Sequence, residues 1–130
     1  MSAIRMDHAG SDPKQDIFDK VGDLDEIQMM NANILVGIYI RPERTRGGII
    51  VQTAQKEDQF QGKVGLVLAI GPLAFKDDDT NKFGGQQLQV GDWVMFRASD
   101  GDALDVNGQR CRLLQDVTVR MKIAQPDTVY

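Results

Sequence analysis

The sequence is poor in the residues that most enzymes and metalloproteins use for their chemistry. It contains one histidine, His8, and one cysteine, Cys111, among 130 residues. A zinc site needs three or four such ligands and a cysteine nucleophile needs a histidine, so neither kind of site is expected. A lone cysteine also excludes an internal disulfide and fits a reducing compartment. We therefore expect no enzyme activity, metal or cofactor, and we expect Cys111 to pack as a small apolar residue.

Long apolar runs, aromatic residues and excess positive charge are also scarce. No run approaches the roughly twenty residues that span a bilayer, and the first residues lack the apolar stretch of a secretion signal, so we expect a cytoplasmic protein. Aromatic residues make up 6% of the chain. Residues 1–31 carry three basic and seven acidic side chains, whereas residues 32–130 carry twelve of each. This neutral, aromatic-poor body indicates neither a nucleic acid nor a membrane as a partner.

The amino-terminal part has the pattern of one short amphipathic helix. Residues 1–11 are small and polar, and we expect them to be disordered. Asp12 is placed as an N-cap before Pro13, Gln15 stands at the capping-box position, and Gly22 marks the end of the helix. Its apolar residues should pack against the same domain or a neighbouring subunit because so short a helix is unstable alone; they are Ile17, Phe18, Val21 and Leu24.

After this helix the chain reads as short strands separated by glycine and asparagine turns. Asn107-Gly108 is the strongest hairpin signal, Gly37 indicates a bulge or a close backbone approach, and Trp93 and Phe96 are expected in the core. We expect strands at residues 27–30, 34–40, 62–71, 93–97, 104–106, 109–114 and 117–123. The prediction is an all-β fold, a small antiparallel barrel or sandwich. It comprises an amino-terminal extension (1–26), a barrel domain (27–123) and a loose tail (124–130).

Two acidic clusters were weighed as metal sites. Residues 77–81 begin like a calcium-binding loop, but Lys82 occupies the position of the required glycine and Leu88 that of the bidentate glutamate. A solvated loop tip is the better interpretation. Asp100, Asp102 and Asp105 form a looser group for which the same interpretation holds.

The segment 41–62 breaks the strand pattern. It is strongly polar except at its centre, where two glycines precede three aliphatic residues: Gly47, Gly48, Ile49, Ile50 and Val51. An aliphatic triplet flanked by polar sequence predicts an exposed apolar patch on a loop. Loops of this length in a small domain are more often functional or mobile than mere connections.

The order of these parts resembles the GroES family of co-chaperonins over about residues 27–123. The resemblance rests on six stretches taken together: Ile27-Gln-Met-Met30, Ile34-Leu-Val36, Gly47-Gly-Ile-Ile-Val51, Gly65-Leu-Val-Leu-Ala-Ile-Gly71, Val90-Gly-Asp-Trp-Val-Met-Phe96 and the closing strand 116–123. The ordered combination of the glycine-aliphatic loop with Val-Gly-Asp some forty residues later is specific, whereas either motif alone is weak. Residues 1–26 have no counterpart in the ordinary bacterial form, and Asp100-Gly101 stands where an aromatic residue facing the chamber was expected. These departures favour a bacteriophage-encoded form.

The resemblance implies a GroES-like β-barrel that assembles as a homoheptamer and caps a GroEL-type chaperonin ring in its nucleotide-bound state, enclosing an unfolded client protein. The long mobile loop would bind the chaperonin through Ile49, Ile50 and Val51, presented by Gly47 and Gly48. Residues 71–90 would form a roof loop or hairpin, and residues 27–30 and 117–123 would pair between subunits. Burying three aliphatic side chains contributes about 5–8 kcal/mol, and ordering about fifteen loop residues costs on the order of 1 kcal/mol each. One loop should therefore bind weakly, and several tethered loops tightly.

Two other functions stay open at this stage. The chain could be a structural β-barrel of a virus particle, with the triplet or the helix as a docking element and no chaperone activity. It could also be a small barrel that binds single-stranded nucleic acid, which would show salt-sensitive binding; the neutral body makes this the weaker alternative.

Overall fold

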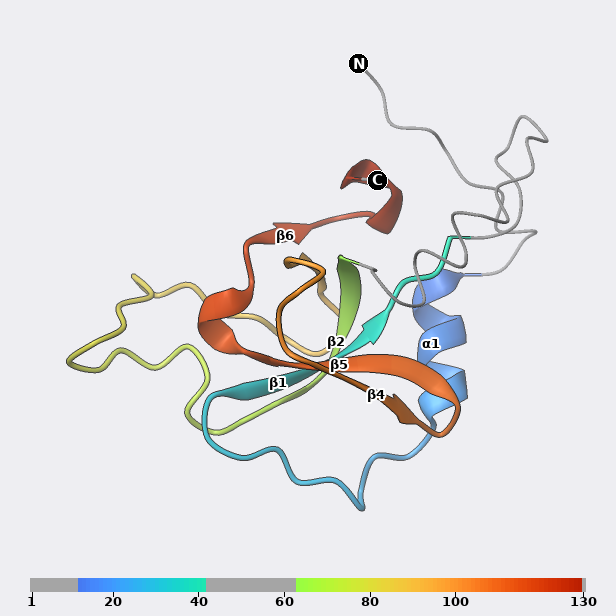
Figure 1. Cartoon of the computed structure of the whole chain (residues 1–130), viewed down its shortest axis with the longest axis horizontal. Helices are drawn as coiled ribbons and strands as arrows, with labels where there is room; N and C mark the ends of the chain where they lie inside the picture. The colour runs from blue at the N-terminus through green and yellow to red at the C-terminus, as the bar shows by residue number, and fades with distance from the viewer. Residues whose placement is uncertain (1–11, 42–62, 130) are drawn as a thin grey trace.

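The computed structural model describes residues 12–41 and 63–129 (Figure 1). Within these ranges the strands form one antiparallel sheet in the order β4-β5-β1-β2-β3-β6. The elements are α1 (Pro13–Val21), β1 (Asn33–Ile38), β2 (Val64–Ile70), β3 (Trp93–Met95), β4 (Asp102–Val106), β5 (Gln109–Gln115), the 3-10 helix η1 (Asp116–Thr118), β6 (Met121–Ile123) and the 3-10 helix η2 (Pro126–Val129). The all-β prediction is confirmed. None of the described helices is long and apolar enough to span a bilayer.

β1 lies near the middle of the sheet and is buried on both faces. Side chains alternate along a strand, and this alternation separates two hydrophobic clusters. Ile34 and Val36 belong to one cluster, together with Phe96 of the segment after β3. Leu35 belongs to the other, which also includes Trp93 of β3. The core positions predicted for Trp93 and Phe96 are confirmed, since they are 3% and 1% exposed.

The helix α1 covers one face of the sheet, packing on β2 and β5 (Figure 1). Asp12 caps it as predicted, with its carboxylate accepting the backbone N–H of Lys14 at 3.0 Å. Gly22 ends it at φ 63°. Gln15 does not complete a capping box, because its amide donates to Asp19 one turn later at 2.8 Å. Of the two expected packing surfaces, its own domain or a neighbouring subunit, the structure shows the first, because Ile17 and Val21 are buried in a hydrophobic cluster of the same chain.

The hairpin at Asn107-Gly108 also forms as predicted. Both residues have positive φ, 51° and 83°, which is the requirement of the two-residue turn that joins antiparallel strands. The turn also contacts the helix, because the Asn107 side chain donates a hydrogen bond to the carbonyl of Val21 at the end of α1. The hairpin therefore satisfies a backbone group that the helix leaves unpaired at its carboxyl end.

The predicted strand at residues 27–30 is wrong for the single subunit. The N–H of Ile27 donates to Leu24 at 2.9 Å, and the carbonyl of Met30 accepts from the N–H of Asn33 at 3.2 Å, so both ends of the segment belong to turns. Within the described chain the segment has no strand beside it to complete a ladder. Ile27 and Met30 remain 40% and 57% exposed.

The long last strand predicted at residues 117–123 is also wrong in its first half. The carboxylate of Asp116 is buried and accepts the N–H groups of Phe75, at 2.9 Å, and of Val117, at 2.7 Å. These bonds turn the chain into η1 instead of a strand. Only Met121–Ile123 pairs, as β6, with β3.

Candidate functional site

The five residues expected to bind a partner fall outside the described part of the chain. Gly47, Gly48, Ile49, Ile50 and Val51 all belong to residues 42–62. The residues that directly precede and follow that segment are described, however. β1 and β2 are antiparallel neighbours with Ile38 opposite Gly65, so the segment leaves and re-enters the sheet on adjacent strands.

Backbone hydrogen bonds continue past the ends of these strands. The N–H of Tyr39 donates to the carbonyl of Val64 at 2.9 Å, and the N–H of Phe96 donates to the carbonyl of Lys63 at 2.9 Å. Residues 39 and 63 are therefore held in the sheet although they lie outside the assigned strands. We call residues 38–41 and 63–64 the loop base.

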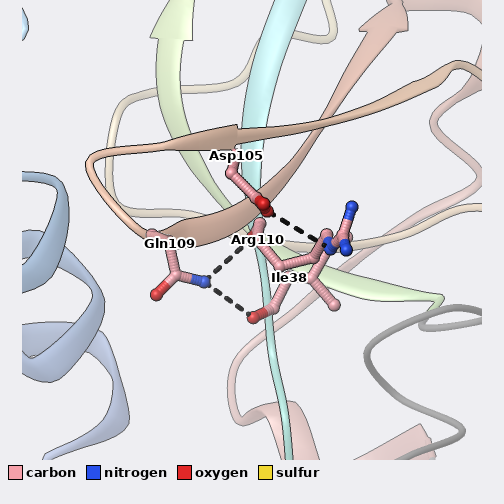
Figure 2. Close-up of polar contacts among 4 residues, drawn as sticks. All are labelled: Ile38, Asp105, Gln109 and Arg110. Carbon is pink, nitrogen blue, oxygen red and sulfur yellow. Dashed lines mark hydrogen bonds and ion pairs between the residues drawn. The ribbon is translucent and has the colours of Figure 1, made fainter.

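A buried glutamine completes the hydrogen bonding of the loop base (Figure 2). Pairing between β1 and β5 ends with Gly37 opposite Cys111, which leaves the next carbonyl, that of Ile38, beyond the ladder. The side-chain amide of Gln109, 5% exposed, donates to this carbonyl at 3.2 Å and to that of Arg110 at 2.9 Å. The sequence analysis missed Gln109; its place directly after the Asn107-Gly108 turn is the signal that fixes it on the strand beside β1.

Tyr39 links the loop base to the carboxyl-terminal segment. Its ring is 2% exposed and meets Trp93 edge-on, with ring centroids 5.6 Å apart and planes at 71°. Its hydroxyl donates to the carboxylate of Asp127 in η2. Pro126 is buried as well, so the prediction of a loose tail at residues 124–130 is wrong for the described residues up to 129.

The helix α1 packs closely against β1 at Gly37. A Cβ added to Gly37 would lie 2.7 Å from Cγ2 of Ile17. The prediction at Gly37 was a bulge or a close backbone approach, whereas the structure shows a close approach by side chains, with that of Ile17 in the helix the nearest. The irregularity of pairing lies elsewhere, between Leu35 and Val36.

Two acidic residues of the segment between β2 and β3, Asp77 and Asp78, accept backbone N–H groups within the segment. Asp78 accepts the N–H groups of Thr80, at 2.8 Å, and Asn81, at 2.6 Å. The bond from Asn81 is the largest cause that lowers the pKa of Asp78. Asp77 accepts the N–H of Phe83 at 2.7 Å. Among the described residues, no group of three or more histidine, cysteine, aspartate or glutamate side chains could hold a metal ion.

A buried arginine that the sequence analysis did not single out stabilises the turn before β4. Arg112 is 6% exposed and donates through Nη1 to the carbonyls of Ala98 and Asp100, the latter at 2.8 Å. Its guanidinium lies 5.8 Å from the ring centroid of Phe96. Burial lowers its pKa. Its role through Nη1 is structural, because both acceptors are backbone carbonyls of its own chain, whereas the buried Nε has no hydrogen-bond partner among the described residues.

Cys111 is fully buried, as predicted, and this gives an expected pH dependence. Burial raises the pKa of the thiol from 9.0 to about 11, so the folded state holds its proton at a pH where the unfolded state has lost it. Stability should therefore fall as pH rises above 9, by roughly 1 kcal/mol between pH 9 and 10. Urea unfolding of the wild type and of Cys111→Ala at both pH values measures this. An equal loss in the two proteins would contradict the assignment to the thiol.

Exposed apolar side chains of the described residues include two groups at edges of the fold. One includes Ile27 and Met30, beside an open groove of about 260 Å³ that Leu104 also lines. The other includes Val117 and Met121, which are 48% and 45% exposed. Met121 belongs to β6, the last strand of the sheet, which pairs on one side only within the described chain. Exposed apolar side chains beside an unpaired strand edge are typical of an interface between subunits.

Comparison with known proteins agrees with this architecture. The family described as "Chaperonin 10 Kd subunit" matches residues 26–123. "Co-chaperonin GroES 2" of Mesorhizobium japonicum is 31% identical over 100 residues, which are 77% of this chain and 91% of that protein. "Co-chaperonin GroES" of Desulfotalea psychrophila is 29% identical over 91 residues, 70% of this chain and 90% of that protein. "Co-chaperonin GroES" of Ralstonia nicotianae is 31% identical over 90 residues, covering 69% and 88%.

Proposed function

This chain belongs to the chaperonin 10 kDa subunit family, and from that premise we propose that it caps a GroEL-type chaperonin ring in its nucleotide-bound state and encloses a folding client. The observation that supports this most is the extent of the family match. It covers the whole described sheet and both strands that flank residues 42–62. The family is one of co-chaperonins rather than of catalysts, so nucleotide hydrolysis would belong to the chaperonin.

We propose that Ile49, Ile50 and Val51 are the chaperonin-binding residues, with Gly47 and Gly48 presenting them. Three aliphatic side chains in a polar segment are suited to bind in an apolar groove. The described residues contain no arrangement of catalytic side chains that would favour a different function for this segment. The two strands that precede and follow the segment, β1 and β2, pair with each other. Each copy supplies a modest affinity, and tethering several copies on one ring makes the total affinity high.

The capping role requires a ring, which we propose is a homoheptamer. Among residues 12–41 and 63–129, the segment 27–30 has no strand partner, and β6 is an edge strand of the sheet. Pairing of the first segment with the β6 edge of the next subunit would cover both exposed apolar surfaces. A contact of this head-to-tail kind closes into a ring when the rotation between subunits allows it.

We also propose that the chain acts in the cytoplasm and is encoded by a bacteriophage. The support for phage origin is its sequence divergence, since relatives are about 30% identical, and the segments outside the family match. Location of the gene among phage structural and packaging genes would support this origin. A position beside a chaperonin gene in a bacterial chromosome would contradict it.

Complex formation tests the proposed function. The purified protein is mixed with a GroEL-type chaperonin and ATP or ADP, and the two are expected to co-migrate in gel filtration, with less complex when nucleotide is omitted. Because the cognate chaperonin is unidentified, chaperonins from several bacterial hosts form the panel. Failure to bind any of them, together with a stable monomer in sedimentation, would favour the alternative of a structural barrel of a virus particle.

A further inference from the structure

Two described elements lie outside the part of the chain that matches the family. The match covers residues 26–123, whereas α1 ends at Val21 and η2 begins at Pro126. Figure 1 shows the two elements at separate places around the sheet. Both contact residues of one hydrophobic cluster, in which Tyr39 and Val64 of the loop base take part.

The helix α1 covers one face of the sheet next to the loop base. Ile17 meets Gly37, and Val21 is fully buried in the same cluster as Tyr39. The end of the helix is held by Asn107 of the β4–β5 hairpin. The strand that leads into the loop base is thus fixed from one side by apolar packing.

The contribution of η2 is a polar contact at the loop base itself. The Tyr39 hydroxyl reaches the carboxylate of Asp127, 88 positions along the chain. A hydrogen bond to a charged acceptor is stronger than one between neutral groups, more so where both partners are partly shielded from water. Val129 packs against the same cluster, so η2 is held by apolar as well as polar contacts.

We propose that Tyr39 and Asp127 form a clamp that positions the loop base, and thereby the partner-binding residues that follow it. This inference rests on the proposed function, because it assigns the clamp a role in chaperonin binding. A loop base that is already ordered lowers the conformational cost of binding, and lower cost appears as higher affinity. Tyr39 and Asp127 are positioning residues: they act through the strand ends and need not touch the chaperonin.

The test compares three variants by two independent measurements. Tyr39→Phe removes only the hydroxyl, Asp127→Ala removes the acceptor, and Asp127→Asn keeps an acceptor oxygen at the same place. Amide hydrogen exchange in the free protein reports on the loop base through the N–H groups of residues 39 and 96, which bond to residues 64 and 63. Binding to the chaperonin is measured separately by titration in the presence of ADP.

For Tyr39→Phe and Asp127→Ala we expect hydrogen exchange at these two amides to be about fivefold faster or more. The affinity for the chaperonin should fall by a similar factor, because the loss of one hydrogen bond changes an equilibrium constant by about this much. Asp127→Asn should recover part of both effects, and the double variant should lose less than the sum of the two single losses. Thr128→Ala, at an exposed side chain of η2, is the matched control and should change neither measurement.

The two measurements separate the possible failures. Unchanged exchange at both amides would overturn the clamp. Faster exchange with unchanged affinity would show a clamp without a positioning role and would overturn the proposal in that respect. A wild-type protein that binds no chaperonin would overturn the proposed function and the positioning role with it, whereas the exchange measurement would still establish the clamp.

Discussion

Replacing Ile50 by aspartate is expected to abolish binding to the chaperonin while leaving the mass of the assembly unchanged. The central aliphatic residue of the triplet should contribute about 1.5–3 kcal/mol when buried, and a carboxylate forced into an apolar groove adds a desolvation cost. In a ring, the loss applies to every subunit at once, so the affinity should fall by far more than 100-fold. Titration of chaperonin with the wild type and with Ile50→Asp in the presence of ADP measures the effect.

The matched control is Leu73→Asp. Leu73 is an aliphatic residue that is 57% exposed in the segment after β2, so the substitution adds the same charge to an apolar surface position elsewhere. Chaperonin binding should be retained in this variant. An Ile50→Asp protein that binds like the wild type would show that the triplet is not the docking element, whatever the family relationship.

The substitution Gly71→Ala is expected to cause a large loss of stability, about 3 kcal/mol. A Cβ at this position would fall within 3.1 Å of three backbone carbonyl oxygens, those of Met30, Asn31 and Asn33. The N–H of Gly71 also donates to Asn33 at 2.8 Å, so strand and turn cannot separate without breaking a hydrogen bond. Overpacking of this kind costs several kcal/mol when the neighbouring atoms are backbone and cannot rotate away. Urea unfolding of the two proteins gives the difference.

Gly85→Ala provides the comparison. Gly85 has φ 81°, and an added Cβ would meet no atom within 4 Å. The cost should then be only that of placing alanine in the left-handed region, about 1 kcal/mol. Equal losses in the two variants would show that the close approach at Gly71 is not what limits the substitution.

Local signals in the sequence were sufficient for elements whose interactions are local. The cap at Asp12, the glycine stop at Gly22 and the Asn107-Gly108 hairpin all involve residues a few positions apart, and all are observed. Stretches with long apolar runs, such as β2, were also recognised correctly. The order of these parts was specific enough to indicate the family, which the comparison with known proteins supports.

The elements that were predicted wrongly depend on contacts between distant positions. Asp116 replaces the first half of the expected last strand with η1 by accepting the N–H of Phe75, 41 positions away. Asp127 holds the carboxyl-terminal segment through Tyr39, 88 positions away. No periodicity within a short window carries such information. Residues 27–30 have the composition of a strand, but in the described part of the chain no strand pairs with them, and composition alone does not reveal this.

One part of the candidate site could be predicted from the sequence, and the other part could not. The glycine-aliphatic motif at residues 47–51 is a sequence signal, and its role in binding stays a prediction because those residues lie outside the described ranges. The loop base was found only from the structure, since Gln109, Tyr39 and Asp127 are ordinary residues in the sequence. They acquire a common role because the fold brings them to the two strands that flank the motif.

Native mass spectrometry of the protein, alone and after mixing with a GroEL-type chaperonin and ADP, tests the central claim most directly. We predict an assembly of seven 14.4 kDa chains that binds the chaperonin as one unit, so that the mass of the complex exceeds that of the chaperonin by seven chains. A protein that stays monomeric, and adds no mass to any chaperonin tested, would contradict the proposal that this chain is a co-chaperonin ring.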